Sequence, residues 1–151
     1  MTGTSAGDVG DQPTQRGFRL VPHTADCIVE AWGPDRCACL AEAVSGLVSV
    51  FAGTADAVAA TVLPVAIDPA PDADILVSLL EEVVYTVEVF GKVPVRVHLG
   101  EREDGGIAGD LEVVDASELP LIGPVPKGVA YHDLAIGPGP GAWRCHVVVD
   151  V

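Results

Sequence analysis

The chain has 151 residues, of which 49% are hydrophobic and 20% are charged, and its net charge is −14. This length is enough for one domain with a substantial core, because a chain of this size buries about 70% of its unfolded surface. No apolar run approaches the ~20 residues of a membrane span, and so acidic a chain is excluded as a strong, direct binder of nucleic-acid phosphates. Any role near RNA should therefore depend on a protein partner or a metal ion.

The N-terminal segment differs from the rest of the chain. Residues 1–15 lack the basic start and the apolar centre of a secretory signal. Their Gly, Ser, Thr, Asp and Gln content is typical of disordered chain. We predict a disordered lead-in over residues 1–16, a single domain over residues 17–151 and a cytoplasmic location. The four cysteines are expected to stay reduced there.

The first helix is predicted after two short strands. The strands cover residues 18–21 and 27–32, and residues 33–35 (Gly-Pro-Asp) then supply a helix start, with Pro and Asp both favourable in a first turn. Apolar residues follow at three- and four-residue spacing as far as Phe51, which indicates an amphipathic helix. Gly53 is the expected C-terminal stop.

A third strand and a second helix come next. Residues 57–67 are rich in Val, Ala and Thr and predict a strand, which Pro64 should confine to a sheet edge or a bulge. The second helix is predicted to start at Asp72 and to end at residues 90–91, with a broad apolar stripe between them. Both helices have one apolar side, which is typical of helices packed on a sheet.

The second half of the chain is mostly β. Val93, Val95, Val97 and Leu99 alternate with other residues at the two-residue period of a strand. The further predictions are strands at 107–114, 129–136 and 143–151, a loop at 115–126 and a break at 132–133. The fold class predicted is α+β, with two amphipathic helices packed on a largely antiparallel β-sheet.

Two stretches at opposite ends of the chain place acids where strands should begin or end. Asp26 directly precedes an apolar strand, and Asp150 and the carboxyl group of Val151 close the last one. If these three groups converge, their mutual repulsion is about 1 kcal/mol per pair in water and about 4 kcal/mol at an effective dielectric of 20. Such a cluster either takes up protons or binds a cation. Oxygen ligands would favour Ca²⁺ or Mg²⁺, with Mn²⁺ as a further candidate. The alternative for Asp150 is a solvated acid at a chain end.

Three other polar residues are candidate functional residues. His23 and His132 are candidate metal ligands or general bases, and each is alternatively a donor that fixes its own loop. Lys127 stands at the head of a predicted strand in a chain with few lysines, and its alternative is an ordinary surface lysine. Asp133 is expected to cap the local turn through its side chain.

The sequence offers little support for nucleophilic catalysis. It has no phosphate-binding loop, no Gly-x-Ser-x-Gly elbow and no Cys-x-x-Cys pair. Two functional alternatives stay open. One is a metal-dependent phosphoester hydrolase that uses His23, Asp26 and His132. The other is a chaperone-like protein-binding module in which the acids are only solvated.

Three segments together resemble the archease family. They are residues 23–26 (His-Thr-Ala-Asp), residues 127–132 (Lys-Gly-Val-Ala-Tyr-His) and the closing strand 143–151, which ends in Asp150 plus one apolar residue. The resemblance extends over residues 19–151. It implies a small α+β protein in which one strand–helix–strand–strand module is inserted in another.

The resemblance also implies a function. Archeases are accessory proteins of the RtcB-type RNA-splicing ligase, which joins RNA ends in tRNA splicing and RNA repair. They promote guanylylation and multiple turnover of that ligase and are not themselves enzymes. The family's metal site, for which Ca²⁺ is the usual ion, corresponds to Asp26, Asp150 and Val151, and its functional lysine corresponds to Lys127. The oligomeric state does not follow from the sequence.

Overall fold

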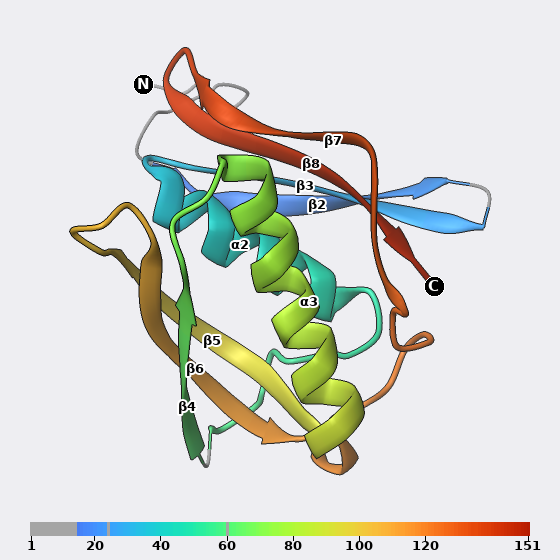
Figure 1. Ribbon diagram of the computed structural model, residues 1–151. Coiled ribbons are helices and arrows are strands. Elements are labelled where there is room, and N and C mark those ends of the chain that lie inside the picture. Colours follow the sequence, from blue (N-terminus) through green and yellow to red (C-terminus); the bar gives the residue numbers. More distant parts are fainter. Residues whose placement is uncertain (1–14, 24, 60) are drawn as a thin grey trace, which may run out of the picture.

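The computed structural model describes residues 15–23, 25–59 and 61–151. Most of the predicted lead-in lies outside these residues, as does Thr24. The elements are shown in Figure 1. They are, in chain order, β2 (Gly17–His23), β3 (Asp26–Gly33), α2 (Arg36–Ser49), β4 (Thr61–Ile67), α3 (Asp72–Phe90), β5 (Lys92–Glu101), β6 (Ile107–Asp115), the short 3₁₀ helix η2 (Ala116–Glu118), β7 (Gly128–Gly139) and β8 (Ala142–Asp150).

The strands form two antiparallel sheets rather than one. A four-stranded sheet has the order β2-β3-β8-β7, and a three-stranded sheet has the order β4-β6-β5. Both helices lie between the sheets (Figure 1), and each contacts strands of both sheets. The α+β prediction is confirmed. The unit β4-α3-β5-β6 is inserted between α2 and β7, so that the first and last strands share one sheet.

The first helix begins where the sequence predicts and ends earlier. Asp35 is the N-cap, and its side chain accepts a hydrogen bond of 2.8 Å from the backbone N–H of Ala38. The helix ends at Ser49, so the prediction that Gly53 stops it was wrong. The N–H of Gly53 instead donates to the carbonyl of Pro120 at 3.0 Å. A contact with the 115–126 loop therefore sets the position of Gly53.

The second helix matches its prediction at both ends. Asp72 and Asp74 lie in its first turn, where a carboxylate interacts favourably with the helix dipole. Gly91 adopts a left-handed conformation with φ 65°, which ends the helix at Phe90. The strand before it, β4, starts at Thr61 and not at residue 57. This strand is at a sheet edge, as the proline at position 64 requires.

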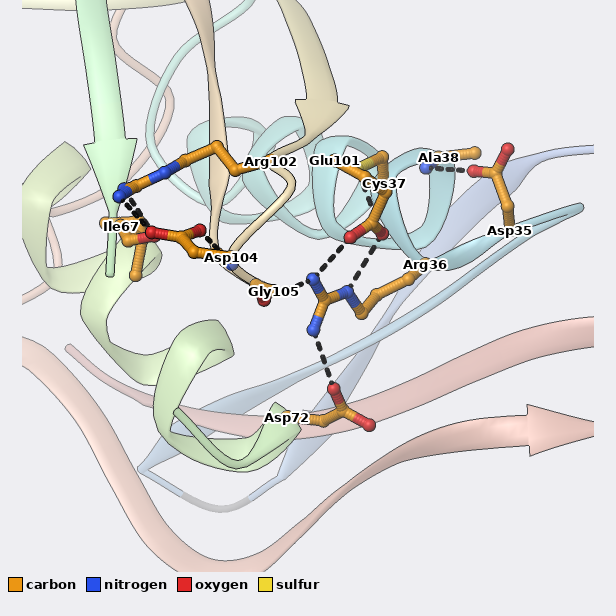
Figure 2. Close-up of polar contacts among 11 residues, drawn as sticks. Asp35, Arg36, Cys37, Ala38, Ile67, Asp72, Glu101, Arg102, Asp104 and Gly105 are labelled. Carbon is orange, nitrogen blue, oxygen red and sulfur yellow. Dashed lines mark hydrogen bonds and ion pairs between the residues drawn. The ribbon is translucent and has the colours of Figure 1, made fainter. Parts of the chain in front are cut away.

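An arginine cluster joins the N-terminal ends of the two helices to the β5–β6 turn (Figure 2). Arg36 donates to Asp72 at 3.0 Å, to Glu101 at 3.0 Å through Nε, and to the carbonyl of Gly105 at 2.9 Å. The Arg36 side chain is only 13% exposed. Because every carboxylate here has a cationic partner, we interpret this cluster as structural. Burial and the neighbouring Glu101 raise the pKa of Cys37 to about 11.

The last hairpin contains the predicted break. The pairing of β7 with β8 shifts between Ala130 and Ala135, and Asp133 within that bulge has φ 59°. Its backbone carbonyl accepts a hydrogen bond from the ring Nδ1 of His146 at 3.0 Å. The bulge thus contacts β8 through the Asp133 backbone, whereas the sequence had assigned a role to its side chain.

Candidate functional site

One row of residues crosses the end of the four-stranded sheet. In the register of β2, β3, β8 and β7, His23 pairs with Asp26, Asp26 with Asp150, and Asp150 with Gly128. Figure 1 shows the β2–β3 hairpin and the C-terminus on the same side of the molecule. Opposed residues of an antiparallel pair have Cα atoms about 4.5–5.5 Å apart and side chains on one face. The two carboxylates are therefore neighbours.

The alternation along β3 and β8 shows which face they occupy. The residues of these strands that face the helices are buried; they are Val29, Ala31, Cys145, Val147 and Val149. Residues one position away along each strand belong to the opposite, outer face of the sheet. Asp26 and Asp150 are both on that outer face, and both are half-buried. The prediction that Asp150 lies on the opposite face from Cys145 and Val149 is confirmed.

The charges of this acidic pair are not compensated by the rest of the described chain. No ion pair between residues of the described ranges includes Asp26 or Asp150. Like charges directly opposite each other destabilise a sheet, by about 1 kcal/mol at 4 Å in water and more in a half-buried position. A cation between the carboxylates would remove this repulsion.

Three other predicted site residues lie next to the acidic pair. His23 is exposed and directly opposite Asp26. The backbone N–H of Lys127 donates to the carbonyl of Asp150 at 2.8 Å, and the residue is exposed. Val151 follows Asp150, and its side chain packs against the core.

His132 is placed differently from the rest. It is exposed in the β7 bulge, outside the paired row. Among the described residues, no three His, Cys, Asp or Glu side chains gather as metal ligands. A hydrolase centre of His23, Asp26 and His132 is therefore not assembled in this part of the chain. Asp26 and Asp150 offer only oxygen donors, which suit a hard cation better than a soft one.

A second feature of the same outer face was not predicted from the sequence. A hollow of about 700 Å³ lies over the other end of the sheet. Its charged and aromatic lining consists of Arg19, Glu30, Trp32, Arg144 and His146. Alternation along β8 indicates that Arg144 and His146 share one face of the sheet. The lining residues of β2 and β3 join them only through strand pairing between segments that are distant in the sequence. The hollow does not include the acidic pair.

Comparison with known proteins identifies the family. The archease protein family model matches residues 18–151. The chain is also 39% identical over 142 residues to the "Probable protein archease" of two Mycobacterium tuberculosis strains, CDC 1551 and H37Rv, covering 94% of this chain and 79% of the relatives. The chain belongs to the archease family.

Solved structures show the same fold as this family member. The solution structure of Methanobacterium thermoautotrophicum protein 1598 matches with a TM-score of 0.74 at 22% identity, over 89% of this chain and 99% of that one. A crystal structure from Thermotoga maritima, described as "an archease, possible chaperone", matches with a TM-score of 0.62 at 19% identity, over 88% of this chain and 96% of that one. At these identities the likeness supports the fold alone. Within the described ranges, no helix is long and apolar enough to cross a membrane.

Proposed function

We propose that this chain is a metal-binding accessory protein of an RtcB-type RNA-splicing ligase, and that it promotes guanylylation and multiple turnover of that ligase in tRNA splicing. The observation that carries the proposal is the direct pairing of Asp26 with Asp150 in a member of the archease family. The chain's role is to assist the ligase, and it is not itself an enzyme. The net charge of −14 supports action through a protein partner, because the chain repels an RNA backbone.

The acidic pair and the carboxyl group of Val151 are the proposed metal ligands. Ca²⁺ is the favoured ion, with Mg²⁺ and Mn²⁺ as alternatives, because all three accept carboxylate oxygens. When bound, the ion supplies positive charge at one edge of an acidic surface. Lys127 adds an exposed ammonium group. Its own backbone N–H donates to the carbonyl of Asp150, which holds the residue next to the pair. With a divalent ion bound, the three carboxylates keep a net charge of −1, and Lys127 brings the local charge close to zero on a chain of net charge −14.

The test is a guanylylation assay with purified ligase, GTP and one equivalent of this chain. Asp26→Ala and Asp150→Ala should each abolish the stimulation, and Lys127→Ala should weaken it. Asp56→Ala is the matched control, because Asp56 is an exposed acid outside the site. Circular dichroism spectra should show that all variants are folded. Unchanged stimulation by both site variants would refute the mechanism.

A second candidate function is a general chaperone-like protein-binding module, and one surface favours it. Three apolar residues at the C-terminal end of α3 are exposed: Tyr85 (53%), Val89 (55%) and Phe90 (61%). The Tyr85 and Phe90 rings are in edge-to-face contact with centroids 5.9 Å apart. Exposed apolar clusters of this kind often mark protein-binding surfaces. If this candidate is right, Phe90→Ser should reduce suppression of aggregation of an unrelated denatured protein, and Asp26→Ala should not.

A further inference from the structure

The outer face of the four-stranded sheet has a second set of aligned residues, at the end away from the acidic pair. The register aligns Gly17, Trp32, Arg144 and Gly137 in one row across β2, β3, β8 and β7. The neighbouring row contains Arg19, Glu30, His146 and Ala135. Both helices pack on the other face of this sheet. All the residues of these two rows except Gly17 line the hollow.

Small residues on the two outer strands explain why a hollow exists there. Gly137 and Ala135 on β7 leave space beside the larger residues of β8, and nothing lies within 4 Å of a Cβ built at Gly137. On the other side, a Cβ at Gly17 would approach the Trp32 ring atom Cζ2 to 3.0 Å, so the indole lies across a position that only glycine leaves open. The hollow measures about 700 Å³, within the ~300–1,000 Å³ of small-molecule sites.

The charge of this hollow is opposite to that of the whole chain. Its lining has two arginines and one glutamate, and Arg19 pairs with Glu30. Arg144 is exposed and takes part in no ion pair within the described part of the chain. His146 is held through Nδ1 by the Asp133 carbonyl at 3.0 Å, and its Nε2 lies 3.9 Å from Glu30. An excess of positive charge thus collects at one place on a chain of net charge −14.

We propose that this hollow is a binding site for a small organic anion that carries a flat unsaturated ring. Arg144 supplies a guanidinium group that can bind phosphate or carboxylate, and Arg19 lines the same hollow. Trp32 supplies an aromatic surface for the ring, since stacking on such a surface accepts any flat ring. The hollow is about 13 Å from the acidic pair, four residues along β3. The hollow is therefore a separate site from the acidic pair, and the inference does not rest on the accessory function.

Fluorescence titration provides the test. The chain contains two tryptophans, so Trp143→Phe leaves Trp32 as the single reporter within the hollow. The probes are adenosine 5′-monophosphate, which joins a ring to a phosphate, and phenylacetate, which joins a ring to a carboxylate, because neither emits where tryptophan does. Adenosine and inorganic phosphate are the separated halves. At least one ring-bearing anion should quench Trp32 saturably, and comparison of the two identifies phosphate or carboxylate as the preferred group.

Matched variants make the test specific. In the Trp143→Phe background, Arg144→Gln should lower the affinity for the quenching ligand by at least about tenfold, or ~1.4 kcal/mol. Arg96→Gln removes the same charge from the other sheet and should leave the affinity unchanged. Equal thermal midpoints of the variants show that the loss is not a folding defect. The proposal is overturned if neither ring-bearing anion binds, if inorganic phosphate alone binds as well as they do, or if Arg144→Gln binds with unchanged affinity.

Discussion

Asp26 of β3 and Asp150 of β8 stand directly opposite each other on the outer face of the four-stranded sheet. Antiparallel pairing forces their side chains onto one face, so the sheet itself holds two carboxylates together at its end. Within the described ranges, no arginine, lysine or histidine forms an ion pair with either of them. This arrangement costs stability unless a cation or a proton compensates for it.

The first prediction concerns the stability of the metal-free chain. Asp150→Asn removes the repulsion but keeps the shape of the side chain, so in EDTA it should raise the free energy of unfolding by about 1 kcal/mol. In saturating Ca²⁺ the order should reverse, because a site at 100 times its dissociation constant adds ~2.7 kcal/mol to the wild type alone. Urea unfolding with and without Ca²⁺ measures both. Asp56→Asn is the control. The difference in free energy of unfolding between this variant and the wild type should be the same with and without Ca²⁺.

The second prediction concerns the carboxyl group of Val151. One alanine added after Val151 moves the terminal carboxylate by one residue and leaves both aspartates in place. The proposed ligand set should then lose one member, and the Ca²⁺-dependent rise in thermal midpoint should shrink by at least half. Differential scanning calorimetry in EDTA and in CaCl₂ measures this rise. A rise equal to that of the wild type would mean that the terminal carboxylate is not a ligand.

The third prediction concerns the arginine cluster in Figure 2. Arg36→Met should lower the free energy of unfolding by about 1–3 kcal/mol, because it leaves Asp72, Glu101 and the Gly105 carbonyl without their donor. Arg96→Gln is the comparison. Its ion pair with Glu112 is on the surface, and the Arg96 side chain is 51% exposed, so its loss should cost less than about 1 kcal/mol. If urea unfolding gave the same loss of free energy for Arg36→Met as for Arg96→Gln, the cluster would not join the two helices.

The fourth prediction concerns the thiols, all four of which are free. Burial raises the pKa of Cys27, and burial with Glu101 raises that of Cys37 to about 11. Hydrogen bonding with Cys145 and burial likewise raise the pKa of Cys39. Since only the thiolate reacts, the native chain should react slowly with a thiol reagent at pH 8 and faster as the pH rises.

Cys27 should account for most of that native reaction, because it is the half-buried cysteine and the other three are buried. Cys27→Ser should therefore remove most of it, and urea should release the remaining thiols. Rapid modification of more than one cysteine in the native chain at pH 8 would contradict the burial of Cys37, Cys39 and Cys145.

Local patterns in the sequence predicted much of the fold. The second helix was right at both ends because its signals are local: acids in its first turn and Gly91 with φ 65° after its last. The first helix was right at its start, where Asp35 caps it, and wrong at its end. Its stop was assigned to Gly53, whose position depends on a bond to Pro120 that no local pattern reveals. The division of the strands into two sheets is likewise a matter of long-range pairing.

The same distinction applies to the candidate site. Alternation along the last strand placed Asp150 on the outer face, and family resemblance linked it to Asp26. The hollow was missed because its lining comes from four strands, and its space comes from small residues such as Gly137 that have no signal of their own. His132 was grouped with His23 although a break was predicted at 132–133, because the sequence did not show that this break sets His132 outside the paired row.

Calorimetric titration of the metal-free chain with CaCl₂ measures directly whether the acidic pair binds a cation. We expect one saturable site per chain in the wild type and in Asp56→Asn. We expect no detectable site in Asp26→Asn or Asp150→Asn, with all four proteins folded. Wild-type protein without a saturable site for Ca²⁺, Mg²⁺ or Mn²⁺, or site variants that bind as the wild type does, would contradict this expectation.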